Sequence, residues 1–342
     1  MAAGVRGRAG LSVVIGVLAA AIALAALASL ALGSQSLAPG AVWQVLTGGG
    51  SEADRAVVEG LRVPRTLLGL VCGAALGVAG ALTQAHTRNP LADPGLIGVN
   101  AGASLGVVVA ISYLGLVSPA AYAWFAVLGA VVAGAVVIGL AARITMLEPM
   151  TTVVLVGAVL SALLASATSA VVLLEVDSAR SFTSWSVGSL AGRDLSVAAG
   201  IAPVLALGVV AALLALPALP GLELGDELAA ALGRNPARDR VIGLGAVVLL
   251  AGGATAACGT LGFLGLLAPH LARRLCGARP IATVGVSALC GALIILLADV
   301  VGRVVLVTSE VSVGVMLAIV GAPVFVVLAR QFDRGTVGGV GA

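Results

Sequence analysis

The sequence has little charge and no lysine. Of its 342 residues, 10% are charged and all 18 basic residues are arginines, whereas an ordinary soluble domain has about 25% charged residues. Aromatic residues make up 3% and hydrophobic residues 60%, and the mean hydropathy is +1.18. So little charge cannot cover the surface of a water-soluble globule, and so much hydrophobicity excludes a disordered chain. The composition therefore predicts a membrane protein.

Long apolar runs account for most of the chain. A membrane-spanning helix needs about 20 mostly apolar residues, and the sequence contains ten candidate runs. The runs are 11–32, 64–83, 92–114, 119–141, 151–174, 195–216, 240–256, 259–275, 281–301 and 311–329. Glycine and proline interrupt several of them, which membrane helices tolerate. We predict an all-α, polytopic protein with about ten transmembrane helices, in which residues 1–342 form a single transmembrane domain.

The arginines favour one orientation. With both termini inside, twelve arginines fall in inner loops and six in outer loops, as the positive-inside rule expects. The outer arginines are Arg55, Arg62, Arg65, Arg180, Arg193 and Arg303. We therefore predict an N-in, C-in protein with an even number of spans. The first run follows two arginines, as in a signal peptide, but its apolar stretch of about 22 residues exceeds the usual length of about 7–15, so we expect a retained span.

Cysteine and histidine are too scattered to indicate a metal site. The cysteines are Cys72, Cys258, Cys276 and Cys290. They include no CxxC pair and lie within or beside apolar runs, so we expect them to be buried apolar packing. His86 and His270 lie in different inner loops, where a lone histidine is more often a hydrogen-bonded structural residue than a ligand. The sequence predicts no metal bound by this chain.

The longest polar inner segment covers residues 217–240. After Pro220 it has acidic residues followed by leucine and alanine, and Gly233 then provides a stop, which predicts a short cytoplasmic helix. Acidic residues at a helix N-terminus are favourable without any further role. A helix this short is marginal alone, so we expect it to pack on a protein partner.

Two other charged features leave alternatives open. Arg62 and Arg65 stand at the outer edge of a glycine-rich run, where they could anchor lipid headgroups or make a functional contact. Asp299 is the one acid inside an apolar run, and such an acid suggests a function. Arg303 follows one helical turn later and could pair with it, which would place Asp299 near the outer edge.

Six sequence blocks together carry a resemblance. They are LRVPR at 61–65, QAHTRNPLADP at 84–94 with Gly98 after it, LGDELAAALG at 224–233, GFLGLLAPHLARR at 262–274, LLADVVGR at 296–303 and SVGVMLAIVGAPVF at 312–325. In this order, on a chain of this length, the blocks resemble the permease family of iron-siderophore, haem and cobalamin ABC importers. The matching residues are Gln84, Asn89, Pro90, Pro94, Gly98, Pro269, His270, Arg273, Asp299, Gly314, Gly321 and Pro323.

The resemblance implies partners and site residues. It implies ten spans per subunit, a second permease forming a homo- or heterodimer, two cytoplasmic ATPases, an outer substrate-binding protein, and a bacterial inner membrane as the location. Arg62, Arg65 and Arg303 match positions that dock the acids of the binding protein, and Met150 and Thr151 fall at the inner gate. The segment 222–232 and the glycine after it match the helix that couples to the ATPase; the residues are Leu222, Glu223, Gly225, Asp226, Glu227, Ala230, Leu232 and Gly233.

The missing lysine assigns ATP hydrolysis to another chain. A P-loop needs a lysine that contacts the phosphates, and this sequence cannot supply one. We therefore expect no enzyme activity and no cofactor on this chain, with ATP and magnesium bound by the partner ATPase. The cargo would be a ferric siderophore or a related metal chelate, with haem and cobalamin left open. An ion-coupled secondary transporter is a weaker alternative because it needs ionisable or unwound sites near the midplane, and a channel or a purely structural membrane protein is weaker still.

Overall fold

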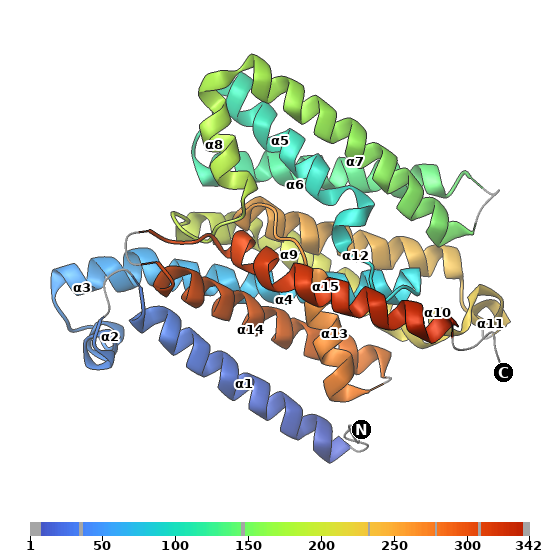
Figure 1. Ribbon diagram of the computed structural model, residues 1–342, viewed down its shortest axis with the longest axis horizontal. Helices are drawn as coiled ribbons and strands as arrows, with labels where there is room; N and C mark the ends of the chain where they lie inside the picture. The colour runs from blue at the N-terminus through green and yellow to red at the C-terminus, as the bar shows by residue number, and fades with distance from the viewer. Residues whose placement is uncertain are drawn as a thin grey trace.

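The computed structural model describes residues 8–33, 37–144, 148–231, 233–277, 279–306 and 309–337, and the regular structure in these ranges is helical. Every predicted apolar run contains one long helix (Figure 1). These helices are α1 (Arg8–Ala31), α4 (Val63–Thr87), α5 (Val99–Leu114), α6 (Pro119–Ala141), α7 (Pro149–Leu174), α9 (Leu195–Ala215), α12 (Pro236–Cys258), α13 (Leu264–Cys276), α14 (Pro280–Val304) and α15 (Val313–Val337).

Short helices connect the long ones. They are α2 (Pro39–Leu46), α3 (Glu52–Val57), the π-helix η1 (Val58–Arg62), the 3-10 helices η2 (Pro94–Ile97) and η3 (Leu216–Ala218), α8 (Val176–Ser186), α10 (Leu219–Leu224) and α11 (Asp226–Ala231). Among the described residues, eight helical segments are long and apolar enough to cross a membrane. The two remaining predicted spans correspond to α5, with 16 residues, and α13, with 13 residues.

The starts of α5 and α13 differ from the predicted runs for a backbone reason. Residues 92–98 form a turn and η2 instead of helix, because Asp93 caps η2 and Gly98 has a left-handed φ of 80°. The run at 259–275 begins with Gly259 at φ 76°, and Phe263 at φ 65° immediately precedes α13. A residue in the left-handed region cannot continue a right-handed helix. Each helix therefore starts later than hydropathy alone predicts.

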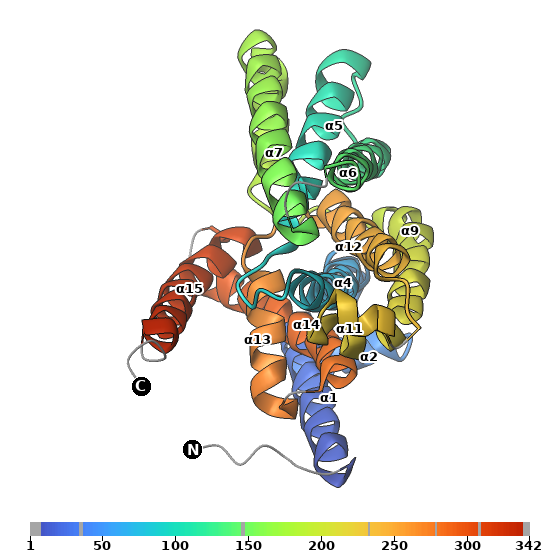
Figure 2. The same ribbon diagram turned by 90° about the vertical axis from the view of Figure 1, so that its right-hand side faces the viewer.

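Helix α4 is the central helix of the bundle, and glycine explains how its neighbours come so close. Figure 2 shows α4 surrounded by α9, α12, α13 and α14. A Cβ atom at Gly77 would overlap the carbonyl of Ser287 on α14, and one at Gly80 would overlap the carbonyl of Gly265 on α13. Small residues permit such backbone approach between membrane helices. Glycine at these two positions therefore lets α4 pack directly against the backbones of α14 and α13.

The helices give the bundle two distinct ends. The start of α1 and the end of α15 lie at the same end as α10 and α11, whereas α2 and α3 lie at the opposite end (Figure 1). We call these the α10–α11 end and the α2–α3 end. Helices α7 and α15 lie on the outside of the bundle, on either side of a gap between their ribbons (Figure 2).

Candidate functional site

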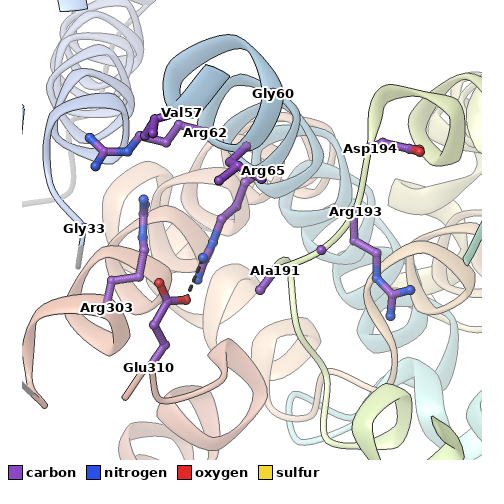
Figure 3. Close-up of a pocket in the computed structure, with 12 residues that line it drawn as sticks. Gly33, Val57, Gly60, Arg62, Arg65, Ala191, Arg193, Asp194, Arg303 and Glu310 are labelled. Atoms are coloured by element: carbon purple, nitrogen blue, oxygen red, sulfur yellow. Dashed lines mark hydrogen bonds and ion pairs between the residues drawn. The ribbon is translucent and has the colours of Figure 1, made fainter. Parts of the chain in front are cut away.

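A cavity of about 570 Å³ opens at the α2–α3 end (Figure 3). Its lining includes four arginines, which are Arg62, Arg65, Arg193 and Arg303, and two acids, Asp194 and Glu310. Three of these arginines are the residues predicted to dock a binding protein. The fold brings them together from the end of η1, the first turn of α4 and the last turn of α14.

Arg62 secures the C-terminal end of α1. Its side chain is buried, and Nη1 donates hydrogen bonds to the carbonyl oxygens of Leu30 and Ala31 at 2.7 and 2.8 Å. The last carbonyls of a helix have no partner within the helix, and they carry the negative end of the helix dipole. A buried guanidinium at this point satisfies both requirements.

Arg303, on α14, contacts the same end of α1. Its Nη1 donates to the carbonyl oxygens of Ser29 and Leu32 at 2.9 and 3.1 Å, and Nη2 donates to Ser29 Oγ at 2.7 Å. Nη2 also lies 3.0 Å from Asp299 Oδ2. The predicted pairing of Asp299 with Arg303 is therefore confirmed, and Asp299 lies near the α2–α3 end of α14 as expected.

Arg65 completes the cluster and is its link to the surface. Its Nη2 lies 2.8 Å from Asp299 Oδ1, and its Nη1 lies 2.7 Å from Glu310 Oε2, the contact drawn in Figure 3. Asp299 is 2% exposed, whereas Glu310 is 35% exposed. Arg65 therefore has one buried partner and one partner at the mouth of the cavity.

Arg193, one of the predicted outer arginines, is a buried cation for which the sequence predicts no role. It donates a hydrogen bond to the Tyr122 hydroxyl, and its guanidinium carbon lies 5.7 Å from the centroid of that ring. Arg193 Nε is buried and has no hydrogen-bond partner within the described part of the chain. No local pattern signals this pair, because Tyr122 is 71 residues away in the sequence.

At the α10–α11 end, the predicted single helix over 222–232 is wrong at one position. Gly225 has a φ of 113°, a conformation that breaks the helix into α10 and α11. Gly233, at φ 79°, follows the segment as the predicted stop. Leu232 lies outside the described residues, as does the side chain of Glu223. Leu222 is buried, whereas Glu227 and Ala230 are exposed.

Asp226 ties this two-helix segment to the bundle. Its Oδ1 lies 2.7 Å from Arg88 Nη2, and its Oδ2 pairs with Arg240. Arg88 also donates from Nε to the carbonyl oxygen of Leu222 at 2.8 Å. Partial burial alone would raise the pKa of Asp226, but the guanidinium groups of Arg240 and Arg88 lower it below its ordinary value. Asp226 is therefore held as a carboxylate between two arginines.

The predicted gate residues lie at the start of α7. Glu148 Oε2 accepts hydrogen bonds from the backbone N–H groups of Met150 and Thr151 at 2.9 and 3.0 Å. Met150 is buried and Thr151 is exposed. Both residues line a cavity of about 410 Å³ that also contains Thr87 and Asn89. This places them at the α10–α11 end of the bundle.

Three of the matched motif residues, Gln84, Pro90 and Arg273, line one further cavity at this end. Asn89, Pro94 and Gly98 shape the backbone between α4 and α5. Asn89 Oδ1 accepts from the N–H of Leu91, Pro94 starts η2, and Gly98 joins η2 to α5. Pro269 and His270 lie within α13, and Pro323 lies within α15. A Cβ atom at Gly314 would overlap the carbonyl of Val187, and one at Gly321 would overlap Phe263.

The four cysteines are buried and free, as expected of apolar packing. The described residues contain no group of three or more histidine, cysteine, aspartate or glutamate side chains that could hold a metal ion. Arg65, Arg303 and Asp299 thus hold helices together at the α2–α3 end of the bundle. Arg88, Arg240 and Asp226 do the same at the α10–α11 end.

Comparisons with known proteins identify the family of this chain. The model of the FecCD transport family matches residues 21–331. The ferric enterobactin transport system permease protein FepD of Escherichia coli (strain K12) is 42% identical over 309 residues, which are 90% of this chain and 92% of that protein. The Fe(3+)-citrate import system permease protein YfmD of Bacillus subtilis (strain 168) is 38% identical over 278 residues, covering 81% of this chain and 82% of that protein.

A solved structure shares the whole architecture. It is described as an inward-facing conformation of a metal-chelate type ABC transporter, and it aligns with a TM-score of 0.77 and 27% identity over 94% of this chain and 99% of that chain. The family match covers most of the sequence and the fold match covers nearly all of the helical bundle. The chain therefore belongs to the FecCD transport family and is a multi-pass membrane permease.

Proposed function

We propose that this chain is the permease subunit of an ATP-driven importer for ferric siderophores or related ferric chelates in a bacterial inner membrane. Its relatives are named as permeases for ferric enterobactin and for Fe(3+)-citrate, and another relative, 36% identical over 314 residues, is named an iron(3+)-hydroxamate import system permease. These names share ferric iron in an organic complex. We infer the same substrate class for this chain.

The proposal depends mainly on two groups of charged side chains that lie at opposite ends of α4. One group contains Arg65 and its partners, and the other contains Arg88 and Asp226. Arg65 lies in the first turn of α4 and Arg88 directly follows its last residue, so 25 helical residues separate the ends. At about 1.5 Å per residue this is about 37 Å, enough to cross a hydrocarbon core about 30 Å thick. One cluster then faces an outer partner and the other an inner partner.

The α10–α11 segment is the proposed contact with the ATPase. Leu224 and Leu228 are 63% and 54% exposed there, beside the exposed Glu227. Exposed apolar side chains on a polar loop are typical of a protein contact. Because Asp226 is tied to Arg88 and Arg240, a push on this segment would reach α4 and α12. The ATPase would supply ATP and magnesium, and this chain would bind no cofactor of its own.

The outer arginine cluster is the proposed docking site for a substrate-binding protein. Arg65 is the residue best suited to contact an acid of that protein, because its partner Glu310 lies partly exposed at the cavity mouth. Arg62 and Arg303 would act mainly by holding the end of α1, which positions Arg65. A second permease, identical or related, would complete the pathway, with Met150 and Thr151 at its inner gate and both termini inside.

Reconstitution tests this function directly. The chain, the ATPase and the binding protein encoded with it are placed in proteoliposomes, and uptake of ferric enterobactin, ferric citrate, haem and cobalamin is measured with and without ATP. We expect ATP-dependent uptake of a ferric chelate. Uptake of haem or cobalamin alone would change the substrate class. Uptake that needs a proton gradient and no ATPase would instead contradict the importer mechanism.

A further inference from the structure

A second arginine-lined cavity lies at the α10–α11 end of the bundle. It has a volume of about 310 Å³ and is enclosed by the end of α4, the end of α13 and the start of α14. Arg88, Arg273 and Arg279 line it, one from each of these places, and its lining contains no aspartate or glutamate among the described residues. Positive charge concentrated in a concave site attracts anions.

Arg88 and Arg279 retain donors for a ligand. Arg88 uses Nε and Nη2 on the Leu222 carbonyl and on Asp226, which leaves Nη1 outside these two contacts. Arg279 is half-buried, and its side chain makes no hydrogen bond or ion pair with any other described part of the chain. A partly buried cation that lacks a counter-ion is costly, so an anion in the cavity would be stabilised.

The start of α14 adds to the positive potential. The helix begins at Pro280 without a side-chain cap, and Thr283 of its first turn lines the cavity. The N-terminal end of a 25-residue helix carries unsatisfied N–H groups and the positive end of the dipole. This is the arrangement that binds phosphate groups in other proteins.

Gln84 indicates that the ligand also needs a hydrogen-bond donor. It is 4% exposed, and its Nε2 donates to the carbonyl oxygens of Ala92 and Gly265 at 3.3 and 3.4 Å. Its Oε1 is buried without a hydrogen-bond partner in the described residues. A buried acceptor without a donor is unfavourable, because it loses its hydrogen bond to water on burial. The ligand that fits therefore has a negatively charged group and, next to it, a hydroxyl or N–H donor.

We propose that this cavity binds a phosphate group with a neighbouring hydroxyl, as presented by the headgroup of an anionic phospholipid such as phosphatidylglycerol. The phosphate contacts Arg273 and Arg279, and a headgroup hydroxyl donates to Gln84 Oε1. Ile281 follows the cavity residue Pro280 and is 49% exposed, so it offers an apolar surface for an acyl chain. Basic pockets between transmembrane helices are known lipid headgroup sites.

Native mass spectrometry of the full-length chain in detergent tests the site. The chain is titrated with phosphatidylglycerol and, separately, with phosphatidylcholine, and inorganic phosphate is added as a soluble competitor. We expect retained phosphatidylglycerol in preference to phosphatidylcholine. Arg279→Gln should weaken this retention about fivefold, the equivalent of about 1 kcal/mol per arginine near an anionic surface. Arg279→Lys, which keeps the charge, should retain most of the binding.

Arg274→Gln is the matched control, because Arg274 is exposed, lies beside Arg273 and does not line the cavity. Displacement of the lipid by millimolar phosphate would show that free phosphate shares the site. Equal binding of both lipids, or equal losses in Arg279→Gln and Arg274→Gln, would overturn the proposal. So would complete loss of the bound lipid when the ATPase joins the complex, because the cavity would then be a protein contact.

Discussion

At the scale of single residues, Asp299 and Arg303 decide how the α2–α3 end is held together. Asp299 is shared by Arg65 and Arg303, and Arg303 also binds carbonyl oxygens at the end of α1. Sequence spacing predicted the pair of Asp299 with Arg303, because the two residues are one helical turn apart. The contacts with α1 had no sequence signal, because their acceptors are backbone carbonyls more than 270 residues away.

Removing Arg303 should therefore destabilise the protein. Arg303→Gln loses the contacts with Ser29 and Leu32 and half of the charge that balances the buried Asp299. We expect a loss of about 3 kcal/mol, the order found when a buried ion pair is broken. Thermal unfolding in detergent measures it. Arg180→Gln is the control, since Arg180 is exposed and a surface change of this kind costs about 0.5 kcal/mol or less. Equal stability of the two variants would rule out the anchoring role.

A second prediction separates docking from stability at Arg65. Arg65→Gln and Glu310→Gln both remove the Arg65–Glu310 ion pair, but only the first removes the cation proposed to meet the binding protein. Arg65→Gln should weaken the affinity of the binding protein about tenfold, or about 1.4 kcal/mol, whereas Glu310→Gln should leave it unchanged or increase it. Surface plasmon resonance on the reconstituted permease measures both. A similar loss in the two variants would mean that the Arg65–Glu310 ion pair matters and that a direct contact of Arg65 with the binding protein does not.

At the scale of helices, hydropathy located the long elements and backbone geometry set their ends. All ten predicted runs contain a helix, because apolar segments of this length have no other stable form in lipid. The late starts of α5 and α13, and the break between α10 and α11, depend on residues in the left-handed region. Gly225 and Gly98 were visible in the sequence, but a glycine permits such a φ without requiring it. Nothing in the sequence indicates that Phe263 adopts a positive φ.

The α10–α11 segment should respond to acid in one direction. Because the pKa of Asp226 is lowered in the folded state, its contribution to stability is present above the unfolded carboxylate value of about 3.9 and is lost as the pH falls through the folded value. Hydrogen exchange of residues 219–231 should therefore be slow and constant from about pH 8 to 5 and should report loosening below about pH 4, after correction for intrinsic rates. Asp226→Asn should be looser at pH 7 and should lack this transition. A wild-type segment whose protection does not fall at any pH below about 4 would contradict the assignment.

At the scale of the whole molecule, the arginine count and the fold agree on how charges are divided. Arginines predicted to lie outside, such as Arg62 and Arg193, meet at one cavity. Predicted inner arginines, such as Arg88 and Arg279, meet at the opposite end. This division of the arginines is predictable from the sequence, because loop membership depends only on the order of spans. The two cavities are not predictable in this way, because each is assembled from helices distant in sequence.

The direction of the bundle in the membrane can be read by thiol labelling, and the four native cysteines make this practical because all are buried. Glu52 is exposed at the α2–α3 end, and Arg238 is exposed near the α10–α11 end. With both termini inside, Glu52→Cys should react with a membrane-impermeant maleimide in spheroplasts, and Arg238→Cys should react only after the membrane is permeabilised. The wild-type chain should label weakly under both conditions. If only Arg238→Cys were labelled in intact spheroplasts, the orientation would be opposite to the predicted one. Arg65 and its neighbours would then lie on the cytoplasmic side, where no extracytoplasmic binding protein could reach them.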